Sequence, residues 1–67
     1  MLYKEREWRR QKAIELLIRA SEAVLSPTVE PMAAAILYTA MALHHITVLA
    51  GEQARELAMK TAQEIAL

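Results

Sequence analysis

A run of 21 residues without any charge, from Pro31 to Gly51, constrains this chain more than any other feature of its sequence. Fifteen of these positions are hydrophobic, and they fall on every side of a helical wheel. A helix that is apolar all round is typically a buried helix. The sequence therefore predicts a central helix that has to be covered on all its sides.

The length of the chain decides what can cover this helix. With 67 residues, the chain is long enough for one domain and too short for two. A hairpin partner would shield only one side of the apolar helix, and exposing the other sides to water is unfavourable at roughly 25 cal/mol per Å². We therefore expect further copies of the chain to cover them, with the helix at the centre of an obligate, symmetric homo-oligomer.

Two prolines, Pro27 and Pro31, mark the one clear interruption, because proline lacks an N–H and disfavours the α conformation of the preceding residue. Thr28 is the expected N-cap of the helix that follows. A loop this short joins antiparallel neighbours, so the predicted fold is an all-α helical hairpin. The expected single domain, residues 1–67, contains a helix over 2–25, a loop over 26–28 and a helix over 29–66.

Gly51 is the point at which the long second helix could break. Glycine often ends a helix, but the residues after Gly51 include no Ser, Thr, Asp or Asn near enough to cap a new one. This favours a continuous helix over 29–66 that overhangs the first. In the alternative, the helix ends at Gly51 and residues 52–66 fold back to make a three-helix bundle.

His44 and His45 are the natural candidates for a metal site, because imidazole titrates near neutral pH and ligates zinc and haem iron. Two ligands on one helix need a spacing of three or four residues, and neither His has a His, Glu or Cys at such a distance. One chain therefore builds no metal or cofactor site. A symmetric oligomer could still gather copies of one His at its axis, and we keep such a metal- or haem-binding bundle as an alternative.

Another role for the two histidines is to fix the alignment of the hairpin. If facing residues have numbers that sum to about 53 or 54, His44 lies level with Arg9, and His45 lies level with Trp8. Each ring would then hydrogen-bond a neighbour, such as Glu5 or a partner subunit's tyrosine.

The expected contacts between subunits come from three sources. Trp8 lies on the otherwise polar side of the first helix, and Trp is enriched at interfaces. The second helix supplies large apolar side chains, while alanines at every fourth position from 50 to 66 form a ridge that allows close helix packing. The predicted interface residues are Trp8, Ile36, Leu37, Tyr38, Met41, Leu43, His45, Ile46, Leu49, Ala54, Leu57, Ala58 and Ile65.

Other functions find little support in the composition. Eight Lys and Arg balance eight Glu, and no basic stripe forms that would bind nucleic acid. With no Asp or Cys and only two Ser, the chain has few groups for catalysis, so we expect no enzyme activity, cofactor or small-molecule substrate. The apolar run is long enough to cross a membrane, but its histidines and many alanines make it only weakly hydrophobic. A membrane peptide is thus an alternative to the oligomer.

The chain as a whole resembles de novo designed helical homo-oligomers. The resemblance rests on the uninterrupted helices, the Ser26-Pro27 loop, the lack of Asp, Asn, Phe and Cys, and the Glu-Ala-Arg-Leu texture of residues 52–67. It implies a coiled-coil-like bundle that assembles with itself and has neither a substrate nor a natural partner. A natural small oligomerisation module is the alternative origin.

Overall fold

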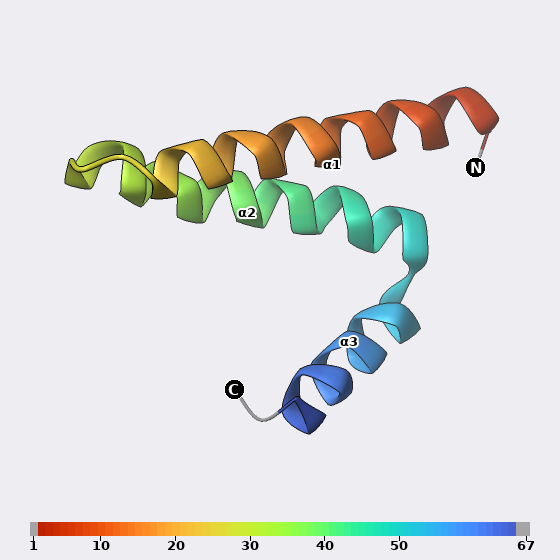
Figure 1. The fold of residues 1–67 in the computed structure, drawn as a ribbon. Helices are drawn as coiled ribbons and strands as arrows, with labels where there is room; N and C mark the ends of the chain where they lie inside the picture. The colour runs from red at the N-terminus through yellow and green to blue at the C-terminus, as the bar shows by residue number, and fades with distance from the viewer. Residues whose placement is uncertain (1, 66–67) are drawn as a thin grey trace.

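The computed structural model describes residues 2–65, which form three helices and no strand. Helix α1 spans Tyr3–Val24, α2 spans Val29–Ala50 and α3 spans Glu52–Glu64. Helices α1 and α2 lie side by side and run in opposite directions, joined by the loop at the left of Figure 1. The predicted all-α helical hairpin is therefore confirmed.

The contact between α1 and α2 is made mainly by small side chains. Ala20 and Ala23 of α1 pack with Ala35 of α2, and Tyr38 lies against this cluster. Ala42 is the most buried residue in the described part of the chain, and Leu16 is the only buried side chain larger than alanine. Alanine lets two helices approach closely but buries only about one methyl group, or roughly 0.8 kcal/mol, per residue. The hairpin thus has a tight contact and a small hydrophobic core.

The turn between α1 and α2 forms where the two prolines predict it. Helix α2 begins at Val29, after an extended Thr28 with φ −104° and ψ 154°. The Thr28 side chain does not cap the helix. Its hydroxyl lies 3.1 Å from that of Ser26, whose Oγ also accepts the Thr28 N–H at 3.3 Å. Thr28 is thus the N-cap residue by backbone position, while Ser26 organises the turn.

The continuous helix over 29–66 is wrong, because α2 ends at Ala50. Gly51 has φ 84° and ψ 169°, a conformation open essentially to glycine alone, and its N–H closes α2 on the carbonyl of Thr47 at 2.8 Å. Helix α3 begins directly after it without any side-chain cap. The acidic Glu52 in its first turn is favourable at the positive end of the helix dipole. The lack of an N-capping side chain after Gly51 therefore does not mean that the helix continues through this residue.

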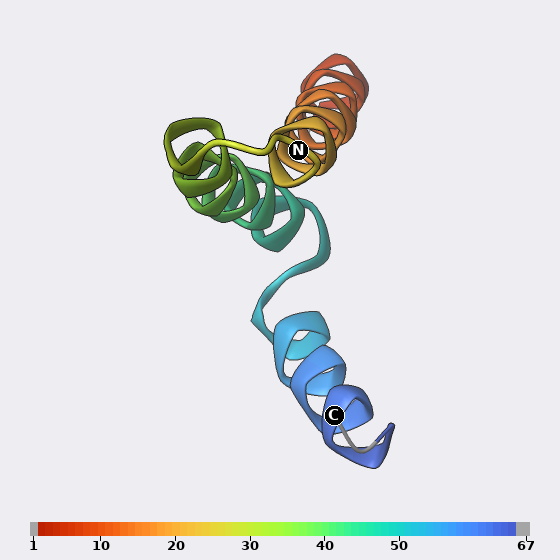
Figure 2. The same ribbon diagram turned by 60° about the vertical axis from the view of Figure 1, so that its left-hand side comes forward.

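The three-helix bundle expected from a break at Gly51 does not form either. Helix α3 leaves the open end of the hairpin, and α2 and α3 make a V (Figures 1 and 2). Within Glu52–Glu64, no residue is buried. The radius of gyration is 13.7 Å, against about 11 Å for a compact domain of this length. The protomer is therefore an open structure with α3 as a projecting arm.

Candidate self-association surface

One side of the hairpin is an almost continuous apolar surface. The side of α1 that faces neither α2 nor the charged residues of α1 carries large aliphatic side chains. Helical geometry places a second set of large aliphatic side chains, from α2, on the same side of the hairpin. All of them are exposed, from 40% for Ile46 to 76% for Ile36. We call this surface the apolar face; it consists of Ile14, Leu17, Ile18, Met32, Ile36, Leu43 and Ile46.

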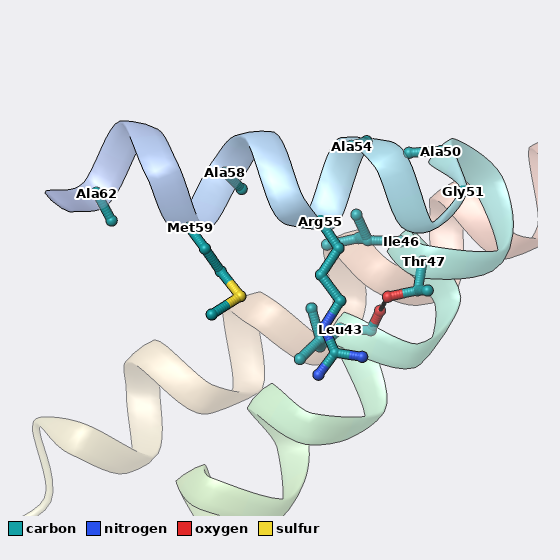
Figure 3. Close-up of a pocket in the computed structure, with 10 residues that line it drawn as sticks. All are labelled: Leu43, Ile46, Thr47, Ala50, Gly51, Ala54, Arg55, Ala58, Met59 and Ala62. Carbon is teal, nitrogen blue, oxygen red and sulfur yellow. Dashed lines mark hydrogen bonds between the residues drawn. The ribbon is translucent and has the colours of Figure 1, made fainter. Parts of the chain in front are cut away.

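Where the apolar face reaches α3, it continues into a groove of about 390 Å³ (Figure 3). Leu43, Ile46 and Ala50 form the α2 wall of the groove, and alanines of α3 together with Met59 form the opposite wall. Arg55 is the only charged residue in the lining. The groove therefore offers an apolar, small-residue surface between two helices, which we call the α2–α3 groove.

The hydroxyl groups of α2 do not interfere with burial of this surface. Thr39 donates to the carbonyl of Ala35 at 2.7 Å, and Thr47 donates to that of Leu43 at 2.8 Å. Such bonds within the helix satisfy the hydroxyl without any outside partner. Both threonines can therefore be covered by an apolar neighbour at little cost.

The polar cluster at the open end of the hairpin involves His45. The Arg9 guanidinium donates from Nη1 to Nδ1 of His45 at 3.1 Å, because Arg has no acceptor. The Trp8 ring meets the His45 ring edge to face, with centroids 5.4 Å apart, and the Arg9 guanidinium lies 5.8 Å from the Trp8 centroid. His45 thus lies beside Trp8, as the predicted register requires, whereas Arg9, which was expected level with His44, also reaches His45. Its hydrogen-bond partner is Arg9, whereas the sequence suggested Glu5 or a tyrosine of a partner.

The surroundings of His45 in this cluster lower the pKa of its ring. Partial burial lowers its pKa most, followed by the positive charge of Arg9 and by His44 and Lys12. The hydrogen bond from Arg9 has the same effect, since it requires an unprotonated Nδ1. Glu5 faces Arg9 at 3.6 Å and partly compensates its charge.

The described residues contain no group of three or more His or Glu side chains that could hold a metal ion. His44 is exposed, and its ring centroid lies 5.6 Å from that of His45. Nδ1 of His45 is already occupied by a cationic donor, which opposes binding of a second cation there. Among residues 2–65, neither histidine therefore belongs to such a group of potential ligands.

The predicted interface residues divide into two groups in the structure. Tyr38, His45 and Leu49 are partly buried on the side of α2 that faces α1, and the Leu49 carbonyl accepts a bond from Arg6. They are therefore engaged at least partly within the protomer. Ala54 is half-buried at the α2–α3 groove, and the others are exposed: Trp8, Ile36, Leu37, Met41, Leu43, Ile46, Leu57, Ala58 and Ile65.

The predicted interface residues include Trp8 of α1, but none of the α1 residues of the apolar face and only part of the groove lining from α3. Ile14, Leu17 and Ile18 belong to the apolar face, and Met59 lines the groove. The sequence signal for these α1 residues is that apolar side chains cover a wide sector of this helix. One neighbouring helix covers only a stripe of about 100°, so the rest of the sector is left exposed. Met59 gave no such signal, because it lies outside the alanine ridge.

Helix α2 is long and apolar enough to cross a membrane. Its most apolar window of 18 residues has a mean hydropathy of 1.6, and only 11% of that window is buried inside the protomer. The core helix of a soluble domain is mostly buried, so the protomer alone does not account for the composition of α2.

The total surface measures what the protomer leaves uncovered. Its solvent-accessible area is 5521 Å², whereas a compact protein of the same mass exposes about 4,200 Å². The excess of about 1,300 Å² is larger than the roughly 800 Å² that each partner contributes to a standard protein interface.

No protein-family model, no curated protein and no solved structure matches the chain.

Proposed function

We propose that this protein is a self-assembly module, whose function is to form a homo-oligomer with α2 in the buried layer between subunits. The observation that carries the proposal is the exposure of the apolar face, because its aliphatic side chains lie next to each other on one side of the hairpin. Contiguous apolar patches of this kind mark interaction sites. The proposal includes no catalytic step, and it applies equally to a designed oligomer and to a natural oligomerisation module.

The small core of the protomer supports the same proposal. Ordering a residue costs roughly 1–2 kcal/mol in backbone entropy, and domains this small usually need a disulfide, a metal or a partner. The chain has no cysteine, and the buried residues among 2–65 are alanines and one leucine. A second copy, packed on the apolar face, would supply the missing hydrophobic stabilisation.

A membrane is the second environment that could cover α2, and the composition of α1 argues against it. Helix α1 runs along α2 and carries ten charged residues, among them Arg9, which bonds His45 near the end of α2. A charged residue at the centre of a bilayer costs about 2.5–3.5 kcal/mol even on insertion scales. The hairpin would therefore have to open before α2 could span a bilayer.

The experiment that tests the proposal compares two single substitutions to glutamate. Leu43 lies on the apolar face and is 43% exposed in the protomer, so Leu43→Glu leaves the hairpin contact intact but places a charge in the proposed interface. An unpaired buried charge costs several kcal/mol, so we expect association to weaken at least about 100-fold. Gln53→Glu makes the same change of charge at an exposed position on α3, outside both the apolar face and the α2–α3 groove, and serves as the control.

Size-exclusion chromatography with light scattering, run over a dilution series, reads out the mass of each variant. We expect an oligomer for the wild type and for Gln53→Glu, and a smaller species for Leu43→Glu. A wild type that is a folded monomer at micromolar concentration contradicts the proposal. Protein that is recovered only in detergent indicates a membrane peptide instead.

A further inference from the structure

The apolar side of helix α3 is only partly covered within residues 2–65. Its large side chains, Leu57 and Ile65, are each more than 60% exposed, while Ala54 and Ala62 on the same side are half-buried at the α2–α3 groove. In the same part of the chain, no hydrogen bond or ion pair joins α3 to the hairpin, and the backbone bond of Gly51 belongs to the end of α2. Helix α3 is therefore an amphipathic arm whose position is set by one glycine, and its apolar side needs a partner.

The α2–α3 groove has the form of a site for a helix. Ala54, Ala58 and Ala62 recur every fourth residue along its α3 wall, and Figure 3 shows their side chains along that helix. Small residues in an i, i+4 row let a second helix approach to about 8 Å. The opposite wall, formed by Leu43 and Ile46, belongs to the apolar face. A helix placed in the groove would therefore bury both surfaces at once.

We infer that the occupant of the α2–α3 groove is the α3 helix of a second copy, exchanged reciprocally across a two-fold axis. This inference rests on the proposed self-assembly and specifies its geometry. Each chain supplies both an unfilled groove and an unpartnered helix of 13 residues, about 20 Å long. Reciprocal exchange of an identical element satisfies both copies with the same contacts.

The uncovered area of the protomer favours a second copy over a small apolar ligand. An excess near 1,300 Å² over a compact protein matches the contribution of one subunit to a large interface. A ligand confined to a groove of about 390 Å³ would leave most of the apolar face and the outer side of Leu57 in water. A partner chain that enters the groove also reaches the face beside it.

The first test places a charge in the groove. Ala58→Glu changes a wall residue in a helix that Glu also favours, so α3 should stay helical. Gln53→Glu adds the same charge on the same helix, at an exposed position outside the groove, and is the matched control. Light scattering over a dilution series should show at least a tenfold weaker association for Ala58→Glu and wild-type association for Gln53→Glu.

An unchanged dilution profile for Ala58→Glu overturns the exchange of α3 while leaving assembly through the hairpin in place. In that case Leu43→Glu would still dissociate the oligomer, so the two proposals fail separately. A helical content equal to that of the wild type, measured by circular dichroism on both variants, excludes loss of folding as the cause of dissociation.

The second test uses the absence of cysteine from the sequence. Residue 58 is the midpoint of α3, so antiparallel exchange across the axis brings the two copies of this position together. A disulfide requires Cα atoms within about 7 Å. Ala58→Cys should therefore give a covalent dimer under mild oxidation, and Gln53→Cys should not. Equal, low cross-linking of the two variants would contradict the pairing of α3 with α3.

Discussion

At the scale of single residues, the Arg9–His45 contact shows both what the sequence can predict and what it cannot. The register predicted for the antiparallel hairpin placed His45 level with Trp8, and the structure confirms this contact. It also placed His44 level with Arg9, whereas Arg9 bonds His45. The predicted hydrogen-bond partner of the His45 ring was wrong. Residue spacing determines which residues lie level with each other, but not which of several polar side chains reaches the imidazole. Arg9 reaches it because the long side chain crosses to α2 while its Nε stays near Glu5.

The lowered pKa of His45 gives a pH dependence with a definite sign. The unfolded chain binds a proton at His45 near pH 6.5, whereas the folded chain binds it only at lower pH, because burial and Arg9, His44 and Lys12 disfavour the imidazolium. The contribution of His45 to the free energy of unfolding is therefore fully present above pH 6.5 and is lost as the pH falls below 6.5. Glu5 is the acidic group that faces Arg9, and its charge moderates the effect.

Chemical denaturation of the wild type and of His45→Gln, at fixed protein concentration between pH 8 and pH 5, measures this contribution. Glutamine still accepts a hydrogen bond but does not titrate. We expect the free energy of unfolding of the wild type to fall relative to that of His45→Gln below pH 6.5. The His44→Gln variant keeps the Arg9 contact and should retain the fall. Parallel curves for wild type and His45→Gln would show that the ring does not differ between the folded and unfolded states.

At the scale of elements, the sequence located the start of α2 at Val29 better than its end at Ala50. Proline restricts itself and the residue before it, so Pro27 and Pro31 leave the chain few alternatives. Glycine widens the choice, and Gly51 is compatible with both a continuous helix and a break. The direction taken by α3 depends on the φ and ψ of that one residue, and no pattern in the neighbouring side chains specifies them.

Replacing Gly51 by alanine should therefore change the shape of the protomer. An added Cβ meets no atom within 4 Å, so the effect is one of backbone strain, roughly 1–3 kcal/mol at φ 84° and ψ 169°. The chain can relieve this strain by continuing α2 into α3 as one helix. We expect Gly51→Ala to gain helical signal in circular dichroism and to lose the V, which small-angle scattering would record as a more extended particle.

A D-alanine at position 51 is the matched control, since it has the same side chain and favours positive φ. A chain of 67 residues is within reach of chemical synthesis, and this variant should scatter like the wild type. If L-alanine and D-alanine give the same helical signal and the same radius of gyration, the conformation of Gly51 does not control the direction of α3.

At the scale of the whole molecule, the sequence predicted that the protomer would leave apolar surface uncovered, and the structure locates that surface. The uncharged run of α2 supplied the argument, because a hairpin covers one side of a helix only. The concave form of the surface was not predictable, because it depends on the break at Gly51 that turns α3 toward the apolar face. The subunit number of the proposed oligomer is not predictable either, since it would follow from packing angles between copies and not from the composition of one helix.

If folding depends on assembly, the melting temperature should depend on protein concentration. Unfolding of a dimer into two chains becomes less favourable by about 1.4 kcal/mol for each tenfold rise in concentration. For a unit of two 67-residue chains, an unfolding entropy of about 2.1 cal/mol/K per residue converts this into a rise of roughly 5 °C per decade. Melting curves followed by circular dichroism from 1 to about 100 μM would cover two decades. A melting temperature that stays constant over this range would mean that the hairpin folds without a second copy, and that its alanine core, small as it is, suffices.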